Sequence, residues 1–167
     1  MPAHCGWRSA ARIKAVPMFQ KLLFTNAPAA TILIRLMVGA VFLSEGIQKF
    51  LFAAEVGAGR FEKIGFTAPE FAAKFVACFE IACGSLVLLG LLTRLSVIPL
   101  ITIMIVAIAS TKIPILREQG FWKMAHEART DWSMLLGSIF LLIAGAGSLS
   151  IDAWLMSRRQ RVGAGNR

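Results

Sequence analysis

Charged residues are scarce in this sequence, and acidic residues are the scarcest of them. Only 16% of the 167 residues are charged, and nine acidic residues stand against eighteen basic ones. With 57% apolar residues, the chain is too hydrophobic for an intrinsically disordered protein. Three cysteines are too few for a disulfide scaffold, and the basic residues are too dispersed for a DNA-binding protein. What remains is a small membrane protein whose water-facing parts are basic.

Histidine is also scarce, and this limits metal chemistry. The chain has only His4 and His126, and a zinc-protease motif starting at His126 would need a second histidine where the sequence has Thr130. Cys78 and Cys83 lie five residues apart, on different sides of a helix, which suits neither a disulfide nor a shared metal. The sequence also lacks a Ser-His-Asp set, a P-loop and a dinucleotide fingerprint. We therefore predict no metal site and assign no catalytic residue.

Four apolar stretches are long enough, or nearly so, to cross about 30 Å of hydrocarbon as helices. They predict spans at residues 29–52, 71–92, 95–111 and 132–155. We therefore expect an all-α fold, a polytopic membrane four-helix bundle, with one domain of residues 29–155 between basic tails of residues 1–28 and 156–167. Trp132 and Trp154 bracket the fourth span like an interfacial aromatic belt, to which tyrosine, absent from this chain, cannot contribute.

The link between the third and fourth spans has the most distinctive sequence in the chain. Pro114 is expected to end the third helix, and Gly120 allows a turn. Apolar residues at helical spacing from Phe121 to Trp132 predict a short interfacial helix before the fourth span. The link also carries a polar group, in which we expect His126 to be solvated. Its members are Lys112, His126, Glu127, Arg129 and Asp131.

The distribution of Lys and Arg predicts the orientation of the bundle. Each tail carries four of these residues and the short turn near Arg94 carries one, whereas the two longer links together carry six. Because cytoplasmic segments are enriched in Lys and Arg, we expect both termini to be cytoplasmic.

Four charged residues are predicted to lie inside the membrane: Arg35, Glu45, Lys49 and Glu80. A charged side chain at a helix centre costs about 2.5–3.5 kcal/mol to insert, so each needs a partner or water. Glu80 therefore either pairs with a cation of the first span or takes up a proton, and Arg35 either reaches the surface or meets a carboxylate. Two interpretations stay open for this cluster: contacts that fix how the helices pack, or a polar cavity for protons, a quinone head group or another small substrate.

Small residues indicate which helix faces are close-packed. In the first span, Arg35, Gly39, Phe42, Gly46 and Lys49 fall on one face, which should point into the bundle, and Gly84 shares a face with Glu80 in the second span. The predicted helix-packing glycines are Gly39, Gly46, Gly84 and Gly137. The opposite face of the first span is expected to contact lipid through Ile34, Val38, Val41 and Ile47.

Several strings of this sequence resemble the DoxX family of small bacterial membrane proteins. They are RLMVGAVFLSEGIQKF, EIACGSLVLLGLLTRL, TKIPIL followed by GFW, and HEARTDWSMLLGSIFLLIAGAGSLSIDA, and together they span roughly residues 35–152. The resemblance implies a four-helix integral membrane fold. It also implies an association with redox systems, since relatives include subunits of a terminal quinol oxidase and of a thiosulfate:quinone oxidoreductase.

We therefore expect an accessory subunit of a quinone-linked redox system in the bacterial plasma membrane, without catalysis of its own. Its surroundings would be the lipid bilayer, a membrane or periplasmic redox protein, a quinone between the first two spans and a second copy of the chain, but no nucleic acid. Two alternatives stay open. One is a quinone-linked oxidoreductase subunit acting on a small sulfur compound, and the other is a pathway for protons or small solutes.

Overall fold

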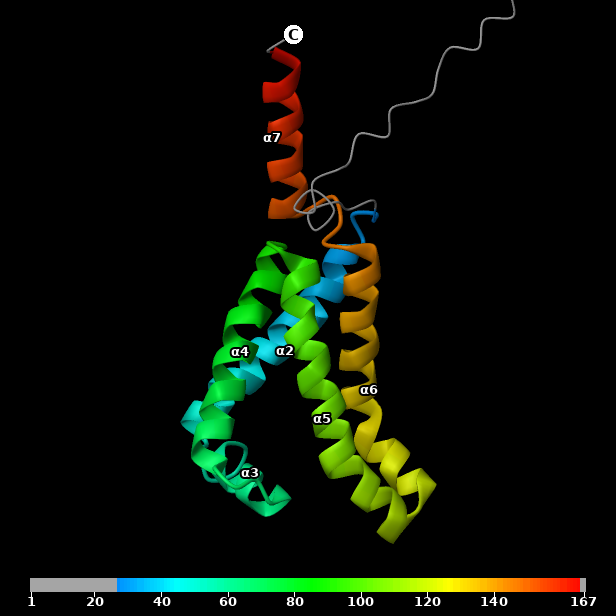
Figure 1. Ribbon diagram of the computed structural model, residues 1–167. Helices are drawn as coiled ribbons and strands as arrows, with labels where there is room; N and C mark the ends of the chain where they lie inside the picture. Colours follow the sequence, from blue (N-terminus) through cyan, green and yellow to red (C-terminus); the bar gives the residue numbers. More distant parts are fainter. Residues whose placement is uncertain (1–26, 166–167) are drawn as a thin grey trace, which may run out of the picture.

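The structure, a computed structural model, describes residues 27–165 and builds them from helices joined by turns (Figure 1). Nothing in this range is a strand, so the predicted all-α fold is confirmed. The predicted tails at residues 1–28 and 156–167 lie partly outside the described residues. The helices are α2 (Thr31–Leu51), α3 (Ala58–Ile64), α4 (Pro69–Leu89), α5 (Thr93–Gln119), α6 (Phe121–Ala144) and α7 (Ile151–Gly165).

Helices α2, α4, α5 and α6 form the bundle (Figure 1). At one end, which we call the α7 end, α2 begins, α4 turns into α5, and α7 emerges after α6. The short helix α3 and the turn between α5 and α6 lie at the opposite end, which we call the α3 end. By length and composition, α2, α4 and α5 can each cross a membrane, and the fourth predicted span falls mainly on α6.

The outer faces of the bundle are apolar, as a lipid environment requires. Phe71 on α4 and Ile143 on α6 are both 72% exposed, and Leu136 on α6 is 60% exposed. A surface of this kind would be unfavourable in water. It supports the membrane assignment made from composition.

The C-terminal boundary of the third predicted helix differs from the expectation. Pro114 does not end α5, which continues to Gln119 with Pro99 and Pro114 inside it. A proline inside a helix removes one backbone hydrogen bond and kinks the chain, but it does not have to stop it. Here α6 packs along α5, and an ion pair between Lys112 and Asp131 joins the two helices close to Pro114.

The fourth predicted span also differs from the expectation. The expected interfacial helix and the span are one continuous helix, α6, which ends at Ala144 rather than near residue 155. Gly145 and Gly147 take positive φ angles of 85° and 83° there, a conformation that favours glycine, and α7 begins only at Ile151. Trp154 therefore lies on α7, and the prediction that it and Trp132 bracket one span is wrong.

Glycines bring α2 and α4 into backbone contact. A Cβ atom at Gly84 would lie 2.9 Å from the backbone nitrogen of Leu43 and 3.1 Å from the carbonyl oxygen of Gly39. A Cβ atom at Gly46 would lie 2.9 Å from the carbonyl oxygen of Ala77. No larger residue fits these positions without a shift of the helices.

The other side of α2 is packed as well, because α2 lies between α4 and α6. Val38 is fully buried, and its side chain lies 2.8 Å from where a Cβ atom at Gly137 of α6 would be. The prediction that Val38 contacts lipid is therefore wrong, whereas Ile47 is 42% exposed. Ile34 and Val41 are half-buried against the core.

Replacing Gly84 by leucine should separate α2 from α4. We expect a loss of about 2–3 kcal/mol in unfolding free energy, because the added atoms meet backbone rather than a flexible side chain. Thermal unfolding followed by circular dichroism in mild detergent measures this. The matched control is Ala82→Leu, on the exposed side of the same helix, which should leave the melting temperature nearly unchanged.

Candidate functional site

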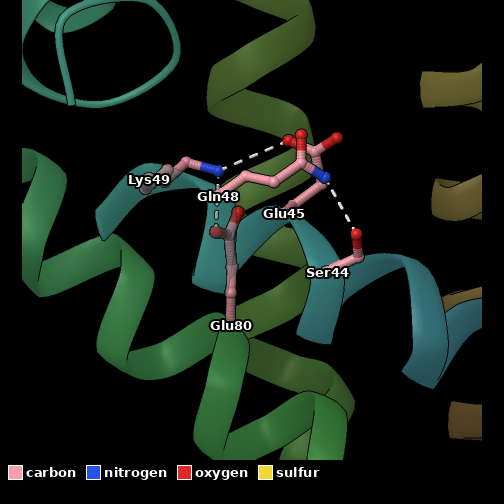
Figure 2. A network of polar contacts seen from close by, with 5 residues as sticks. All are labelled: Ser44, Glu45, Gln48, Lys49 and Glu80. Carbon is pink, nitrogen blue, oxygen red and sulfur yellow. Dashed lines mark hydrogen bonds and ion pairs between the residues drawn. The ribbon is translucent and has the colours of Figure 1, made fainter. Parts of the chain in front are cut away.

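An ion pair within the bundle joins the last turn of α2 to α4. The Nζ atom of Lys49 lies 2.7 Å from a carboxylate oxygen of Glu80, and only 10% and 5% of the two side chains are exposed (Figure 2). Gly46, one turn before Lys49, lets Glu80 come this close, since a Cβ atom at Gly46 would be 3.0 Å from that of Glu80. Of the two alternatives predicted for Glu80, the structure has the one in which it pairs with a cation of the first span.

The pair opens on one side to a half-exposed rim formed by α2. Glu45 lies 3.7 Å from the Nζ atom of Lys49, and 45% of its side chain is exposed. Next to it, the side-chain amide of Gln48 donates a 2.8 Å hydrogen bond to the hydroxyl of Ser44 (Figure 2). The rim therefore places a half-exposed carboxylate and an amide beside the mostly buried ammonium group of Lys49.

Arg35 belongs to a different site, at the α7 end of the bundle. Its guanidinium group donates to backbone carbonyl groups and, among the residues that the structure describes, to no carboxylate oxygen. The acceptors are Val87 (3.0 Å) and Leu88 (2.5 Å) in α4, and Ala146 (3.2 Å) and Leu149 (2.5 Å) after α6. Carbonyl groups of the last helical turn have no partner within their own helix, so Arg35 satisfies the end of α4. The predicted intramembrane cluster is thus two sites.

Gly90 makes room for Arg35. It ends α4 with a φ angle of +67°, and a Cβ atom there would lie 2.6 Å from the guanidinium carbon of Arg35. The glycine is needed both for the turn and for the approach of the arginine.

A second buried charged group, Asp152, lies near Arg35. This carboxylate is 2% exposed and accepts hydrogen bonds from the backbone N–H groups of Leu92 (2.8 Å) and Thr93 (3.2 Å), at the start of α5. Its own N–H group donates to the carbonyl group of Gly90. No local pattern in the sequence indicates that Asp152 caps a helix some sixty residues earlier.

The electrostatics of Asp152 reflect both its burial and its partners. Burial raises the pKa of the Asp152 carboxyl above its usual range, although the backbone N–H groups of Leu92 and Thr93 and the charge of Arg35 act in the opposite direction. An acceptor at a helix N-terminus also interacts favourably with the helix dipole.

The predicted polar group of the outer link is a set of separate contacts. The Lys112–Asp131 ion pair (3.1 Å) connects α5 to α6 and is largely buried. On the exposed side of α6, Lys123 pairs with Glu127 at 3.2 Å, and an Nη atom of Arg129 lies 2.6 Å from the imidazole of His126. Among the described residues, no group of three or more His, Cys, Asp and Glu side chains could hold a metal ion.

Comparison with known proteins confirms the resemblance to the DoxX family. The sequence model of the DoxX family matches residues 30–113. The "Uncharacterized membrane protein Rv3486" of Mycobacterium tuberculosis is 51% identical over 156 residues, which cover 90% of this chain and 96% of that protein. The "Putative oxidoreductase CatD" of Bacillus subtilis is 29% identical over 130 residues, 78% of this chain and 90% of that protein. No solved structure matches the chain.

Removing one member of the Lys49–Glu80 pair should lower the unfolding free energy more than removing both members. Glu80→Gln leaves the buried ammonium group of Lys49 without its closest partner, and we expect a loss of about 3 kcal/mol in unfolding free energy. The double variant Lys49→Met, Glu80→Gln should recover most of this loss in detergent melting experiments. Glu70→Gln, which affects the exposed Lys74–Glu70 pair, is the control and should change little. A double variant less stable than Glu80→Gln would contradict the prediction.

Asp152 should be required for the α4–α5 turn. Asp152→Ala removes the acceptor of two N–H groups, and we expect a loss of about 1–2 kcal/mol together with faster hydrogen exchange at Leu92 and Thr93. Asp152→Asn keeps one acceptor oxygen and should lose less. Ser157→Ala, further along α7, is the control. Unchanged exchange at both amides in Asp152→Ala would show that the cap is dispensable.

Proposed function

Because this chain belongs to the DoxX family, we propose that it is an accessory subunit of a quinone-linked redox system in the bacterial plasma membrane, without catalysis of its own. Support for the redox association comes from the resemblance and from the name of the Bacillus subtilis relative, which calls that protein an oxidoreductase. Support for the accessory role comes from the way the chain uses its buried charges.

The observation that carries the proposal is that these charges act between helices. Lys49 joins α2 to Glu80 of α4, and Arg35 joins α2 to the end of α4 and to the segment after α6. A group that takes part in proton or electron transfer must change its protonation or its contacts. The four hydrogen bonds of Arg35 suit a fixed structural role instead.

The rim beside Lys49 is the place where we propose that a quinone head group binds. The carbonyl oxygens of a quinone accept hydrogen bonds, and Gln48 and Lys49 supply N–H donors next to the half-exposed Glu45. The apolar tail of the quinone would lie along the lipid-facing side of α2, where Ile47 and Phe50 are exposed. In this arrangement the chain holds the quinone and the partner protein carries out the chemistry.

We also propose that the α7 end faces the cytoplasm. This follows from the excess of Lys and Arg in the segments that belong to this end, and from the rule that such segments stay inside.

Purification from membranes of the native host tests the proposal. We expect a tagged full-length chain, extracted in mild detergent, to bring down a redox protein and quinone. Gln48→Leu should reduce the quinone recovered several-fold and leave the protein partner in place, with Ser133→Ala on α6 as control. Recovery of the chain alone, without partner or quinone, would contradict the proposal.

The catalytic alternative predicts a different result. A quinone-linked oxidoreductase acting on a small sulfur compound would reduce quinone as the purified chain, and would lose this activity in Glu80→Gln. Such turnover by the chain alone would replace the accessory role with a catalytic one.

A further inference from the structure

The two ends of the bundle differ sharply in charge. All nine acidic residues lie between Glu45 and Asp152, and eight of them belong to the membrane cluster or to the α3 end. There the links and helix ends carry seven basic and six acidic residues, which nearly balance. Within residues 27–165, the α7 end has Asp152 as its sole acidic residue, and that residue is buried. Besides Arg35, its basic residues in the described range are Arg94, Arg158, Arg159 and Arg161.

Apart from Asp152, the sequence has no acidic residue before Glu45, between Glu80 and Glu118, or after Asp152. Asp152 is already bound to the N–H groups of Leu92 and Thr93 and lies near Arg35. The N-terminal segment of residues 1–26 has no acidic residue and adds four basic ones. The excess of positive charge at this end therefore favours a negatively charged partner.

The structure holds the first part of α7 against the bundle. The Asp152 carboxylate and its backbone N–H group bind the α4–α5 turn, and Ile151 and Leu155 are half-buried. Arg94, in the first turn of α5, donates to the carbonyl group of Ile143 at the end of α6 with a distance of 2.8 Å. The arginine positions thus begin where the membrane-spanning helices end.

An aromatic residue, Trp154, lies in the first turn of α7, close to the ends of the membrane-spanning helices. Trp154 is 52% exposed on α7, and the guanidinium carbon of Arg158 lies 4.4 Å from the centre of its ring. Tryptophan favours the boundary between hydrocarbon and head groups, because its ring is apolar and its N–H group is a donor. Positions 154, 158 and 161 follow one another at helical spacing, so they share one face of α7.

We propose that α7, with Arg94, is a binding surface for the head groups of anionic phospholipids in the leaflet at this end of the bundle. Basic residues directly beside a membrane span attract the negative surface of the lipid, and tryptophan anchors the helix at that depth. An acidic protein could also supply negative charge. The position of the arginines next to the end of the spans, together with Trp154, favours lipid.

Native mass spectrometry of the full-length chain in mild detergent tests this surface. Phosphatidylglycerol and phosphatidylcholine with identical acyl chains are added separately, and the retained lipid is measured. We expect tighter binding of phosphatidylglycerol, and a loss of this binding on the order of 100-fold in the triple variant Arg158→Gln, Arg159→Gln, Arg161→Gln.

The control removes three positive charges from the α3 end, in Arg117→Gln, Lys123→Gln, Arg129→Gln. It should retain the lipid preference within about twofold. A second measurement needs no variant: the preference of the wild-type chain should weaken as the salt concentration rises from about 0.05 M to about 0.5 M.

Equal binding of the two lipids by the wild-type chain would overturn the proposal. So would an unchanged preference in the α7 variant, or an equal loss in the control. If the lipids bind equally while an acidic protein co-purifies with the wild-type chain and not with the α7 variant, the partner of this surface is a protein rather than lipid.

Discussion

The hydrogen bonds of Arg35 hold together parts of the chain that are more than a hundred residues apart. One side chain from α2 satisfies the last carbonyl groups of α4 and two carbonyl groups of the segment between α6 and α7. Beside it, Asp152 satisfies the first N–H groups of α5. The turn between α4 and α5 is thus bound from both sides by oppositely charged groups, and every helix of the bundle meets near this point.

This arrangement follows from the membrane environment. Helix ends expose polar backbone groups, and at the edge of the hydrocarbon region each of these groups needs a partner. A buried arginine and a buried aspartate supply donors and acceptors to two helix ends and at the same time offset each other's charge. The Lys49–Glu80 pair likewise brings two buried opposite charges together, here between the sides of two helices. Each buried charge costs free energy of insertion, which agrees with the low content of charged residues in this chain.

The fold was largely predictable because the relevant signals are local. Spans one and two, predicted at residues 29–52 and 71–92, correspond to α2 at Thr31–Leu51 and α4 at Pro69–Leu89. The later helix ends were not predictable in this way. A proline such as Pro114 usually indicates a helix boundary, but α5 packs against α6 and continues past it. The fourth predicted span ends early because the helix breaks at Gly145 and Gly147, although the sequence stays apolar through residue 155. Val38 was placed in lipid because one helix face alone does not show that α2 has neighbours on two sides.

Local patterns of residues are enough to predict a membrane bundle of helices, the charges that lie among apolar residues, and the glycines that allow close packing. These properties depend on hydrophobicity and helical spacing over about twenty residues. By contrast, the pairing of Glu80 with Lys49 rather than Arg35, and the capping of α5 by Asp152, follow from the three-dimensional arrangement of the helices. Such pairings depend on how far each helix is shifted along its neighbour, and that shift results from the packing of all the helices together.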